Sequence, residues 1–351
     1  MSQEMQSGYR IHEWGGDLVE EEFPVPQPGP GEVGIEVEAC GIGLTVLNCI
    51  NGNLDDDPAL LPRVPGHELV GRVVSLGSGV DPELGGQRVT AYFYLACGSC
   101  QQCSSGNQSL CENLDGWVGV HTDGGYAPHT VIPAYNAVVL PDDLDPEVAT
   151  VVPDAVATPV HVCGRRARVV PGDRVVVIGA GGGVGAHMIQ VAAAFGGDVV
   201  GFDITDDKLA LIEELGARAF DSTYISAVDP TTLWSGGPPT VVIDLIGSTA
   251  SLEWSAAALA VGGRLVVLTT FPDRRFSIDP REMVFRQLTL LGSRYASRDE
   301  VMTAANLVSS GTVKPVIGRR CGPDGVAEIH QLLREEKLRG RGVLSWVDAP
   351  V

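Results

Sequence analysis

The middle of the chain alternates short, almost wholly apolar runs with segments of helical pattern. The apolar runs are DRVVVIG, DVVGFD, TVVIDLIG and RLVVLTT, and helical patterns such as GVGAHMIQVAAAFG and KLALIEELGA separate them. Strands that are apolar on both faces are typical of parallel sheets covered by helices on both sides. The sequence therefore predicts a doubly wound α/β domain, which we place at residues 156–295.

The two ends of the chain have a different pattern. Up to residue 155, short apolar runs alternate with Pro and Gly, as in FPVPQPGPGEVGIEVEAC, which is typical of short strands joined by tight turns. After residue 295, two helical segments and a final strand, RGVLSWV, complete the chain, and we predict that they rejoin the N-terminal domain. A chain of 351 residues is long enough for two such cores.

The charge balance excludes some kinds of partner. The chain has 44 acidic and 24 basic residues, a formal net charge of −20. Such a surface repels nucleic acid and anionic lipid headgroups. No apolar run has the length of a signal peptide or a membrane span, so we expect a cytoplasmic protein that binds neither nucleic acid nor membrane.

The most specific local motif is a cluster of cysteines. Four of the eight cysteines lie in a short Gly-, Ser- and Gln-rich loop with the spacing C-x2-C-x2-C-x7-C. Four thiolates suit one tetrahedral zinc ion, and a fully coordinated ion is structural because it leaves no open position for chemistry. A redox disulfide and an iron–sulfur cluster remain as alternatives. The predicted ligands are Cys97, Cys100, Cys103 and Cys111.

A glycine-rich turn connects the first apolar strand of the central domain to a helix. In this context glycines allow a tight turn and let a pyrophosphate approach the N–H groups at the helix N-terminus. The three-residue spacing of the main glycines departs from G-x-G-x-x-G, and a glycine cluster can also be only a flexible loop. The predicted dinucleotide-binding residues of this turn are Gly179, Gly182, Gly183, Val184 and Gly185.

An acidic residue ends the next strand. Asp203 follows Gly185 by eighteen residues, where a carboxylate can accept both ribose hydroxyls and repels a 2′-phosphate. We therefore expect NAD rather than NADP. The alternative is that Asp203 only caps the helix that follows it.

The order of these motifs resembles that of the zinc-containing medium-chain alcohol dehydrogenases over essentially the whole chain. It runs from a strand-rich N-terminal part with GHE at 66–68, through the cysteine lobe at about 95–113 and DAVATP at 154–159, to the glycine turn and the closing GRGVLSW. The resemblance implies a GroES-like catalytic domain formed by residues 1–155 and 296–351 and a Rossmann domain at 156–295. It also implies an active site in the cleft between the domains and a homodimer or homotetramer.

The same resemblance implies roles for individual residues. His67 matches a zinc ligand, Glu68 a carboxylate that can move onto the metal, Asp154 the third ligand position, and Arg341 the arginine that pairs with the glutamate. Two further matches concern the cofactor. Thr158 stands beside the nicotinamide and Lys208 near the adenosine ribose, although Thr158 could be only a helix cap and Lys208 an ordinary surface lysine.

One departure from the family pattern affects the chemistry. The family motif G-[IV]-C-x-[ST]-D aligns with GIGLTV at 41–46, so that Gly43 stands where the first zinc ligand belongs and Val46 replaces an aspartate. His67, Glu68 and Asp154 could still bind zinc through nitrogen and oxygen. In a pocket without metal, Asp154 or Glu68 could instead hold a proton while Thr45 or His67 donates a hydrogen bond to the substrate oxygen.

These observations lead to one leading hypothesis and two alternatives. The leading hypothesis is an NAD(H)-dependent oxidoreductase that interconverts an alcohol and a carbonyl compound, with Thr45, His67, Glu68 and Asp154 at the reacting centre. The first alternative is a reductase or redox-cycling enzyme of the same fold that works without a catalytic zinc, on a conjugated C=C, C=N or carbonyl substrate. The second is a non-catalytic NAD-binding protein.

Overall fold

The computed structural model describes residues 4–268 and 275–347 and divides the chain into two units. Unit 1 consists of Met1–Ala157, Ala296–Ser310 and Ile317–Val351, so both ends of the chain contribute to it. Unit 2 consists of Thr158–Tyr295 and Gly311–Val316.

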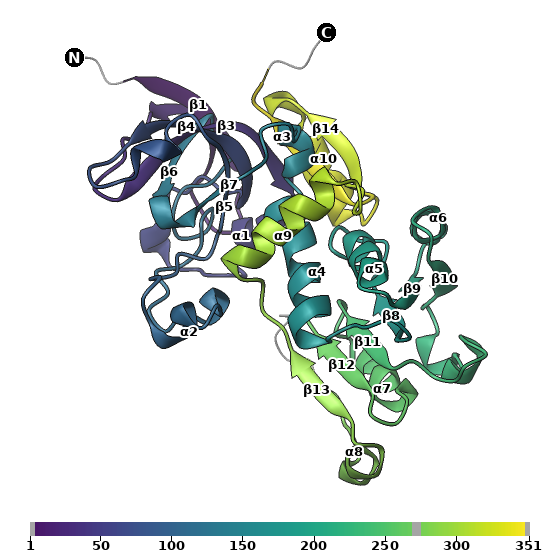
Figure 1. Ribbon diagram of the computed structural model, residues 1–351. Helices are drawn as coiled ribbons and strands as arrows, with labels where there is room; N and C mark the ends of the chain where they lie inside the picture. The colour runs from purple at the N-terminus through teal and green to yellow at the C-terminus, as the bar shows by residue number, and fades with distance from the viewer. Residues whose placement is uncertain (1–3, 269–274, 348–351) are drawn as a thin grey trace. The chain divides into compact units, whose positions relative to one another are not determined.

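Unit 2 contains a six-stranded sheet among its described residues (Figure 1). All neighbouring strands are parallel, as the apolar runs predict, and their order is β10-β9-β8-β11-β12-β13. The first strand of the sheet, β8, lies near its centre. Strands β9 and β10 follow on one side of it, and β11, β12 and β13 follow on the other. This confirms a doubly wound α/β fold, and the order reverses between β8 and β11. The strands are β8 (Arg174–Ile178), β9 (Asp198–Asp203), β10 (Arg218–Asp221), β11 (Val241–Asp244), β12 (Arg264–Val267) and β13 (Thr289–Gly292).

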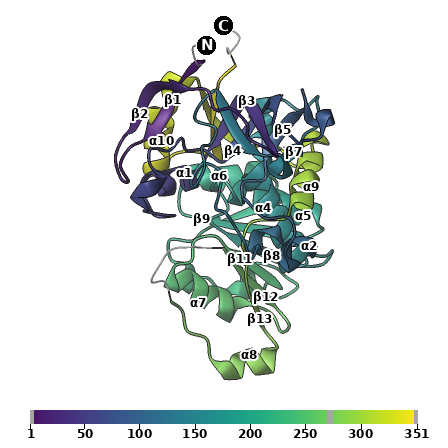
Figure 2. The same cartoon turned by 90° about the vertical axis from the view of Figure 1, so that its left-hand side faces the viewer.

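Helices pack on both faces of this sheet. On one face, buried side chains of the strands, including Phe202, pack against Trp254 of α7. On the other face, Gly201 lies so close to Ile212 of α6 that a Cβ there would be 2.8 Å from its side chain. Strands β8, β11 and β12 lie between α5 and α7 in Figure 2. The helices that pack on the sheet include α5 (Gly185–Ala194), α6 (Asp206–Glu214) and α7 (Thr249–Ala258). The other helices are α4 (Ala157–His161), at the boundary of the two units, and α8 (Pro280–Arg286), which has no buried residue.

Unit 1 is built mainly from antiparallel strands. Its larger sheet has the order β14-β15-β3-β4-β5-β7, with β6 also paired to β3, and β1 and β2 form a separate hairpin. Strands β14 and β15 come from the C-terminal end of the chain and join strands of the N-terminal part, as the sequence predicts. The strands are β1 (Met5–Ile11), β2 (Leu18–Pro24), β3 (Glu32–Ile42), β4 (Glu68–Leu76), β5 (Arg88–Ala91), β6 (His129–Pro133), β7 (Ala137–Val139), β14 (Ile317–Cys321) and β15 (Arg341–Ser345).

Short helices complete unit 1. The longest of them is α9, whose N-terminus has a capping box formed by Ser297 and Glu300. A π-helical turn, η5, carries one of the predicted site residues, Asp154. The bounds are α1 (Leu44–Ile50), α2 (Gln101–Ser104), α3 (Pro146–Ala149), η5 (Val152–Val156), α9 (Arg298–Ser309) and α10 (Val326–Arg334).

The division into units differs from the predicted domains at residues 156 and 157, which belong to unit 1, and at one longer segment. Residues Gly311–Val316 belong to unit 2, whereas the sequence pattern places them with the C-terminal part of unit 1. Gln190 of α5 exchanges two hydrogen bonds with the backbone of Lys314, at 2.9 and 2.8 Å. The backbone N–H of Val316 also donates to Nε2 of His187 at 3.1 Å. The local sequence pattern does not predict these hydrogen bonds, because they join residues more than 120 positions apart.

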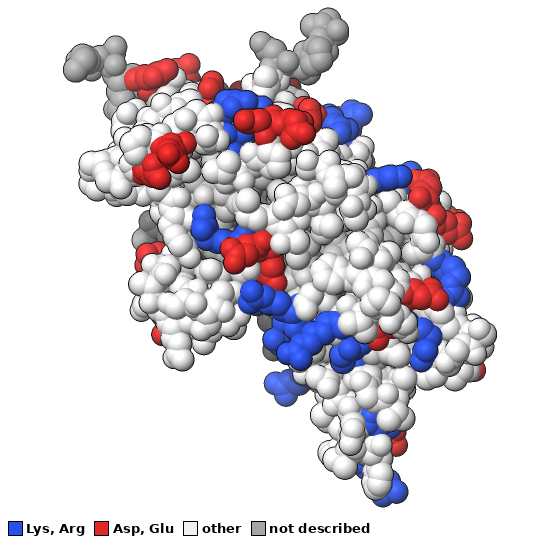
Figure 3. All heavy atoms as spheres, viewed as in Figure 1, with Lys and Arg blue, Asp and Glu red and all other residues white. Residues whose placement is uncertain are grey.

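Surface charge and hydropathy agree with the composition. Acidic and basic side chains are interspersed on the face shown in Figure 3, so the net charge of −20 forms no continuous acidic surface there. Within the described ranges, no helix combines the length and the apolar character that crossing a membrane requires.

Candidate active site and zinc lobe

The four cysteines of the predicted zinc lobe lie together in the structure. The Sγ atoms of Cys97 and Cys103 are 4.0 Å apart, and those of Cys100 and Cys111 are 3.9 Å apart. A zinc ion about 2.3 Å from four tetrahedral sulfurs would separate them by about 3.8 Å, whereas a disulfide needs about 2.05 Å. The geometry therefore fits one zinc ion held by four thiolates and does not form a disulfide.

The backbone of the lobe stabilises the thiolate form of part of this set. The N–H groups of Cys100, Cys103 and Cys97 donate to the sulfurs of Cys97, Cys100 and Cys111, respectively, at 3.3, 3.5 and 3.3 Å. Backbone N–H groups at Ser99 and Cys100 lower the pKa of the Cys97 thiol to about 5. Burial raises the pKa of Cys103 to about 12. A bound cation would favour the deprotonated form of all four thiols.

The second candidate site lies in the larger sheet of unit 1, at the ends of three neighbouring strands, β15, β3 and β4. Strand β3 is antiparallel to both β15 and β4, with Val343 opposite Gly41 and Gly41 opposite Glu68. The last residues of β3 therefore lie between the first residues of β15 and those of β4. This pairing brings the side chains of Arg341 and Glu68 to the two sides of the β3 terminus.

The charged side chains at these strand ends form one buried cluster. Nη2 of Arg341 is 3.0 Å from Oε1 of Glu68 and 2.8 Å from Oδ2 of Asp154. The same Asp154 oxygen is 3.8 Å from Nε2 of His67. The Glu68 side chain is fully buried and that of Arg341 is 6% exposed. Two residues that are distant in the sequence, Asp154 and Arg341, thus share one site with the adjacent pair His67 and Glu68.

Burial controls the electrostatics of the cluster. It raises the pKa of Glu68, and the nearby charge of Asp154 adds to this effect, while Arg341 opposes it. His67 is also buried, and its ring meets that of Phe93 edge to face at a centroid distance of 4.6 Å. Nε2 of His67 has no hydrogen-bond partner among the described residues. That nitrogen is therefore available to a ligand or a substrate.

The donor atoms of His67, Glu68 and Asp154 are close enough together to be considered as a metal site. They lie within 4.8 Å of one another, and nitrogen with two carboxylates is a ligand set that zinc accepts. One nitrogen of Arg341, however, already contacts both carboxylates. The residue types fit zinc, but the guanidinium already contacts one oxygen of each carboxylate, Oε1 of Glu68 and Oδ2 of Asp154.

Two features of this cluster escaped the sequence reasoning. A Cβ on Gly41 would overlap the carboxylate of Glu68, so the absence of a side chain there makes room for the buried acid. Phe93 forms the wall beside His67. The repeated glycine in GIG, at the end of an apolar strand, is a signal that could have indicated the space beside Gly41. Phe93 follows the end of β5, and no sequence motif indicates its position beside His67.

The remaining predicted catalytic residues lie near the cluster in sequence or belong to unit 2. Thr45 is half-buried in α1, which begins directly after Gly43. Thr158 is buried in α4 and belongs to unit 2. The roles of Thr45 at the reacting centre and of Thr158 beside the cofactor stay predictions.

The glycine turn of unit 2 has the form that close phosphate approach requires. It connects β8 to α5, and Gly179 has φ +81°, a conformation that favours glycine. A Cβ on Gly185 would overlap the carbonyl oxygen of Gly179, so this glycine lets α5 begin against the end of the strand. A Cβ on Gly182 would meet only an ordinary contact at 3.5 Å. The N-terminus of α5 is thereby left accessible to an anion.

Asp203 ends β9 beside this turn. Its Oδ2 accepts the N–H of Gly181 at 2.9 Å, and its Oδ1 accepts the N–H of Ile204 at 2.9 Å. The ammonium group of Lys208 lies 3.6 Å from Oδ1. The helix α6 is capped by Thr205, whose side chain accepts from Lys208 N–H, and not by Asp203. The cap alternative is therefore wrong, and the carboxylate is positioned at the turn with Lys208 beside it.

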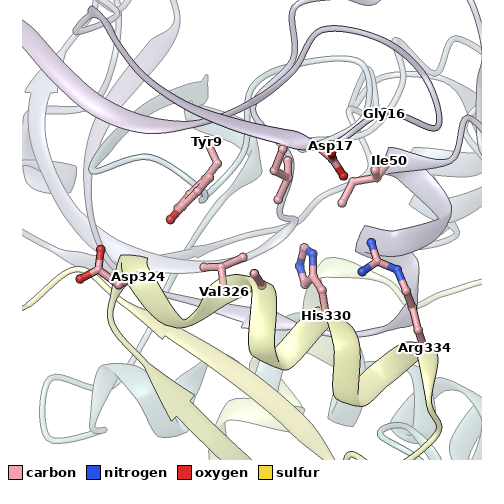
Figure 4. A pocket seen from close by; sticks show the side chains of 10 residues that line it. Tyr9, Gly16, Asp17, Ile50, Asp324, Val326, His330 and Arg334 are labelled. Atoms are coloured by element: carbon pink, nitrogen blue, oxygen red, sulfur yellow. The ribbon is translucent and has the colours of Figure 1, made fainter.

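A separate pocket of about 370 Å³ lies in unit 1 between the β1–β2 hairpin and α10 (Figure 4). His330 and Arg334 of α10 line it together with Tyr9 and Asp17. It contains none of the predicted catalytic residues. His330 is held from behind by the hydroxyl of Tyr126, which lies 3.0 Å from Nε2.

The buried His330 predicts a pH dependence of stability. Burial, followed by the charge of Arg334, lowers its pKa from 6.5 to about 4. The unfolded chain therefore binds a proton that the folded chain does not, and the free energy of unfolding falls by up to about 3 kcal/mol as the pH drops from about 6.5 to about 4. Denaturant unfolding measured across this pH range should show that the free energy of unfolding falls less in His330→Phe than in the native protein. The exposed His12, changed to Gln, should keep the full loss; equal losses in all three proteins would contradict the prediction.

Comparison with known proteins agrees with this architecture. The family model described as "Alcohol dehydrogenase GroES-like domain" matches residues 29–142, and the one described as "Zinc-binding dehydrogenase" matches residues 183–310. An alcohol dehydrogenase of Moraxella sp. is 30% identical over 96% of this chain and 98% of its own length. An alcohol dehydrogenase of Geobacillus stearothermophilus is 32% identical over 95% and 97%. The chain belongs to the zinc-type medium-chain dehydrogenase/reductase family, and it is an oxidoreductase.

Two solved structures and one further sequence relative are also similar to this chain. The crystal structure of AibC has a TM-score of 0.90 and 28% identity over 98% of this chain and 96% of that one. An E. coli alcohol dehydrogenase complexed with NADH has a TM-score of 0.88 and 25% identity over 98% and 100%. An acryloyl-coenzyme A reductase of Sulfurisphaera tokodaii is 27% identical over 92% of this chain and 94% of its own. The family thus includes both alcohol dehydrogenases and a reductase at similar identity to this chain.

Proposed function

We propose that the protein is an NAD(H)-dependent oxidoreductase that interconverts a small alcohol and the corresponding carbonyl compound. The observation that carries this proposal is the buried cluster of His67, Glu68, Asp154 and Arg341 in a chain whose other unit has a glycine turn ending beside Asp203. A polar group buried without a partner is costly, and the unpartnered Nε2 of His67 is therefore a candidate contact for substrate oxygen.

The chain's own residues would supply binding and proton handling. The N–H groups at the start of α5 would hold the pyrophosphate of the cofactor, and Asp203 would accept the ribose hydroxyls, with Lys208 beside it. NAD(H), when bound, supplies or accepts the hydride. His67 would hydrogen-bond the substrate oxygen through Nε2, and the carboxylate of Asp154, 3.8 Å from that atom, would place a negative charge beside it. Asp154 and Glu68 are the carboxylates that could hold the proton exchanged with the substrate.

The test is steady-state oxidation of NADH with a panel of ketones and aldehydes, and reduction of NAD with the matching alcohols. The proposal requires turnover of at least one such pair. Tight NADH binding, measured by fluorescence, with no turnover of any carbonyl, alcohol, enone or imine would instead show a non-catalytic NAD-binding protein.

A second candidate is the reduction of a carbon–carbon double bond conjugated to a carbonyl. The specific observation in its favour is Gly43, which removes the thiolate ligand expected of a catalytic zinc in this family. The acryloyl-coenzyme A reductase among the relatives is consistent with it. NADH oxidation by enones or enoyl thioesters, without turnover of saturated ketones, would favour this candidate over the first.

Asp203 gives a test of cofactor choice. Asp203→Asn keeps an acceptor for the N–H of Gly181 but removes the charge that repels a 2′-phosphate. We expect the ratio of kcat/KM for NADH to that for NADPH to fall at least about tenfold, because a hydrogen bond to a charged group contributes about 1.5–3 kcal/mol. Asp198→Asn, at the exposed start of the same strand, should leave the ratio unchanged. An unchanged ratio in Asp203→Asn would mean that this carboxylate does not contact the ribose.

A further inference from the structure

The end of strand β3 carries two glycines that leave space on the same side of the strand. Gly41 and Gly43 are two residues apart in extended backbone, so a side chain on either would point to the same face. The carboxylate of Glu68 fills the space beside Gly41. The guanidinium of Arg341 fills the space beside Gly43, where a Cβ would overlap Nη1 and lie 2.8 Å from Cζ. No side chain larger than hydrogen fits at position 43 while Arg341 is in this place.

The guanidinium is held there by both acids of the cluster. One nitrogen, Nη2, is within 3.0 Å of Glu68 and 2.8 Å of Asp154, and all three side chains are at most 15% exposed. Asp154 Oδ2, the oxygen nearest to His67, is the atom that accepts from Arg341. A fully buried carboxylate beside one that is only 15% exposed requires a compensating cation, and the arginine supplies a permanent one.

A zinc ion would have to compete with this cation. It would need an oxygen of Asp154, whose Oδ2 is 3.8 Å from His67 and 2.8 Å from Arg341, and an oxygen of Glu68, so that the incoming positive charge would lie next to the guanidinium. It would also have no thiolate from position 43 to compensate for that repulsion. The arrangement of charge therefore opposes a metal at this site, even though the residue types would accept one.

We propose that the guanidinium of Arg341 stands in the place of a catalytic zinc ion as the resident cation of this cluster, that Gly43 makes this possible, and that the native cluster binds no metal. The inference deepens the proposed function, since it states what supplies the positive charge at that site. Arg341 acts on the acids and not on the substrate, so it is a positioning residue.

The direct test is the zinc content of the native protein after dialysis against buffer with low micromolar zinc. Elemental analysis should give about one ion per chain, accounted for by the cysteine lobe. About two ions per chain in the native protein, one of which is lost in Asp154→Asn, would overturn the proposal. This measurement needs no variant that alters the fold.

A double variant tests the role of the arginine itself. Gly43→Cys with Arg341→Ala removes the guanidinium, adds the thiolate and leaves the buried acids without their cation. We expect it to bind about two zinc ions per chain and to show a Tm that rises with added zinc, because a ligand that binds only the folded state stabilises it. The native protein should show no such second rise. Arg320→Ala, which removes an exposed arginine paired with Glu147, should keep one ion per chain.

The results for the double variant and the native protein together decide whether the guanidinium of Arg341 excludes a second zinc ion. If it folds and still binds one ion, the guanidinium is not what excludes the metal, and the proposal is wrong. If it does not fold, the native zinc content alone decides. Native protein with one zinc ion and no hydride transfer would refute the proposed function but not this inference, whereas two ions with normal turnover would do the reverse.

Discussion

Replacing Cys103 by serine should lower the zinc content by one ion per chain. Cys103 is the buried member of the four-cysteine lobe, and its Sγ lies 4.0 Å from that of Cys97, a separation that fits ligands of one tetrahedral ion. A serine hydroxyl does not replace the thiolate, so the lobe at about 95–113 loses the cross-link that closes it. We expect proteolysis within the lobe to become at least about tenfold faster, which corresponds to a loss of about 1.4 kcal/mol of local stability.

Cys321→Ser is the matched control for this experiment. Cys321 is partly exposed, lies in β14 and is not among the residues that could hold a metal. Its replacement should leave the zinc content and the proteolysis rate of the lobe unchanged. An unaltered zinc content in Cys103→Ser, measured by elemental analysis of the purified protein, would show that the lobe is not a zinc site.

The second large effect is expected from His67→Phe. Under the proposed function, Nε2 of His67 hydrogen-bonds the substrate oxygen, and phenylalanine keeps the ring packing against Phe93 but removes the nitrogen. We expect kcat/KM to fall by about 100-fold or more, the usual size of the loss of a positioned polar group in hydride or proton transfer. The dissociation constant for NADH should change little, because the predicted cofactor residues of the glycine turn and Asp203 belong to the other unit.

The exposed His12 provides the comparison. It pairs with Glu21 on the β1–β2 hairpin at 2.9 Å and contacts none of the cluster residues in the structure. His12→Gln should keep the activity of the native protein. If His67→Phe also retained activity, with its fold verified by circular dichroism, His67 would have to be removed from the catalytic assignment.

Much of the fold was predictable because its signals are local. Continuous apolar runs between helical segments predicted the parallel sheet of unit 2, since strands buried on both faces need apolar residues at every position. The spacing of Cys97, Cys100, Cys103 and Cys111 predicted the lobe, because ligands of one ion must lie close in a short loop. The interval from Gly185 to Asp203 predicted that this acid ends the strand after the glycine turn, as it does.

Other features depend on long-range contacts. Asp203 does not cap α6: its Oδ2 accepts the N–H of Gly181, 22 residues earlier in the chain, and the cap is Thr205. Residues 311–316 join unit 2 because Gln190 and His187, more than 120 residues earlier, bond to their backbone. No hydrophobic periodicity or motif within residues 311–316 predicts these hydrogen-bond partners.

The resemblance to the zinc-containing dehydrogenases was enough to predict that a ligand cysteine is absent at position 43 and that His67, Glu68, Asp154 and Arg341 match the other positions of the site. What fills the space beside Gly43 could be learned from the three-dimensional structure alone: the pairing of β15, β3 and β4 brings Arg341 and Glu68 to the end of β3, and Gly43 leaves the guanidinium free to reach both acids. A residue list gives the charges of a site, but their compensation depends on distances of about 3 Å between strands that are distant in the chain.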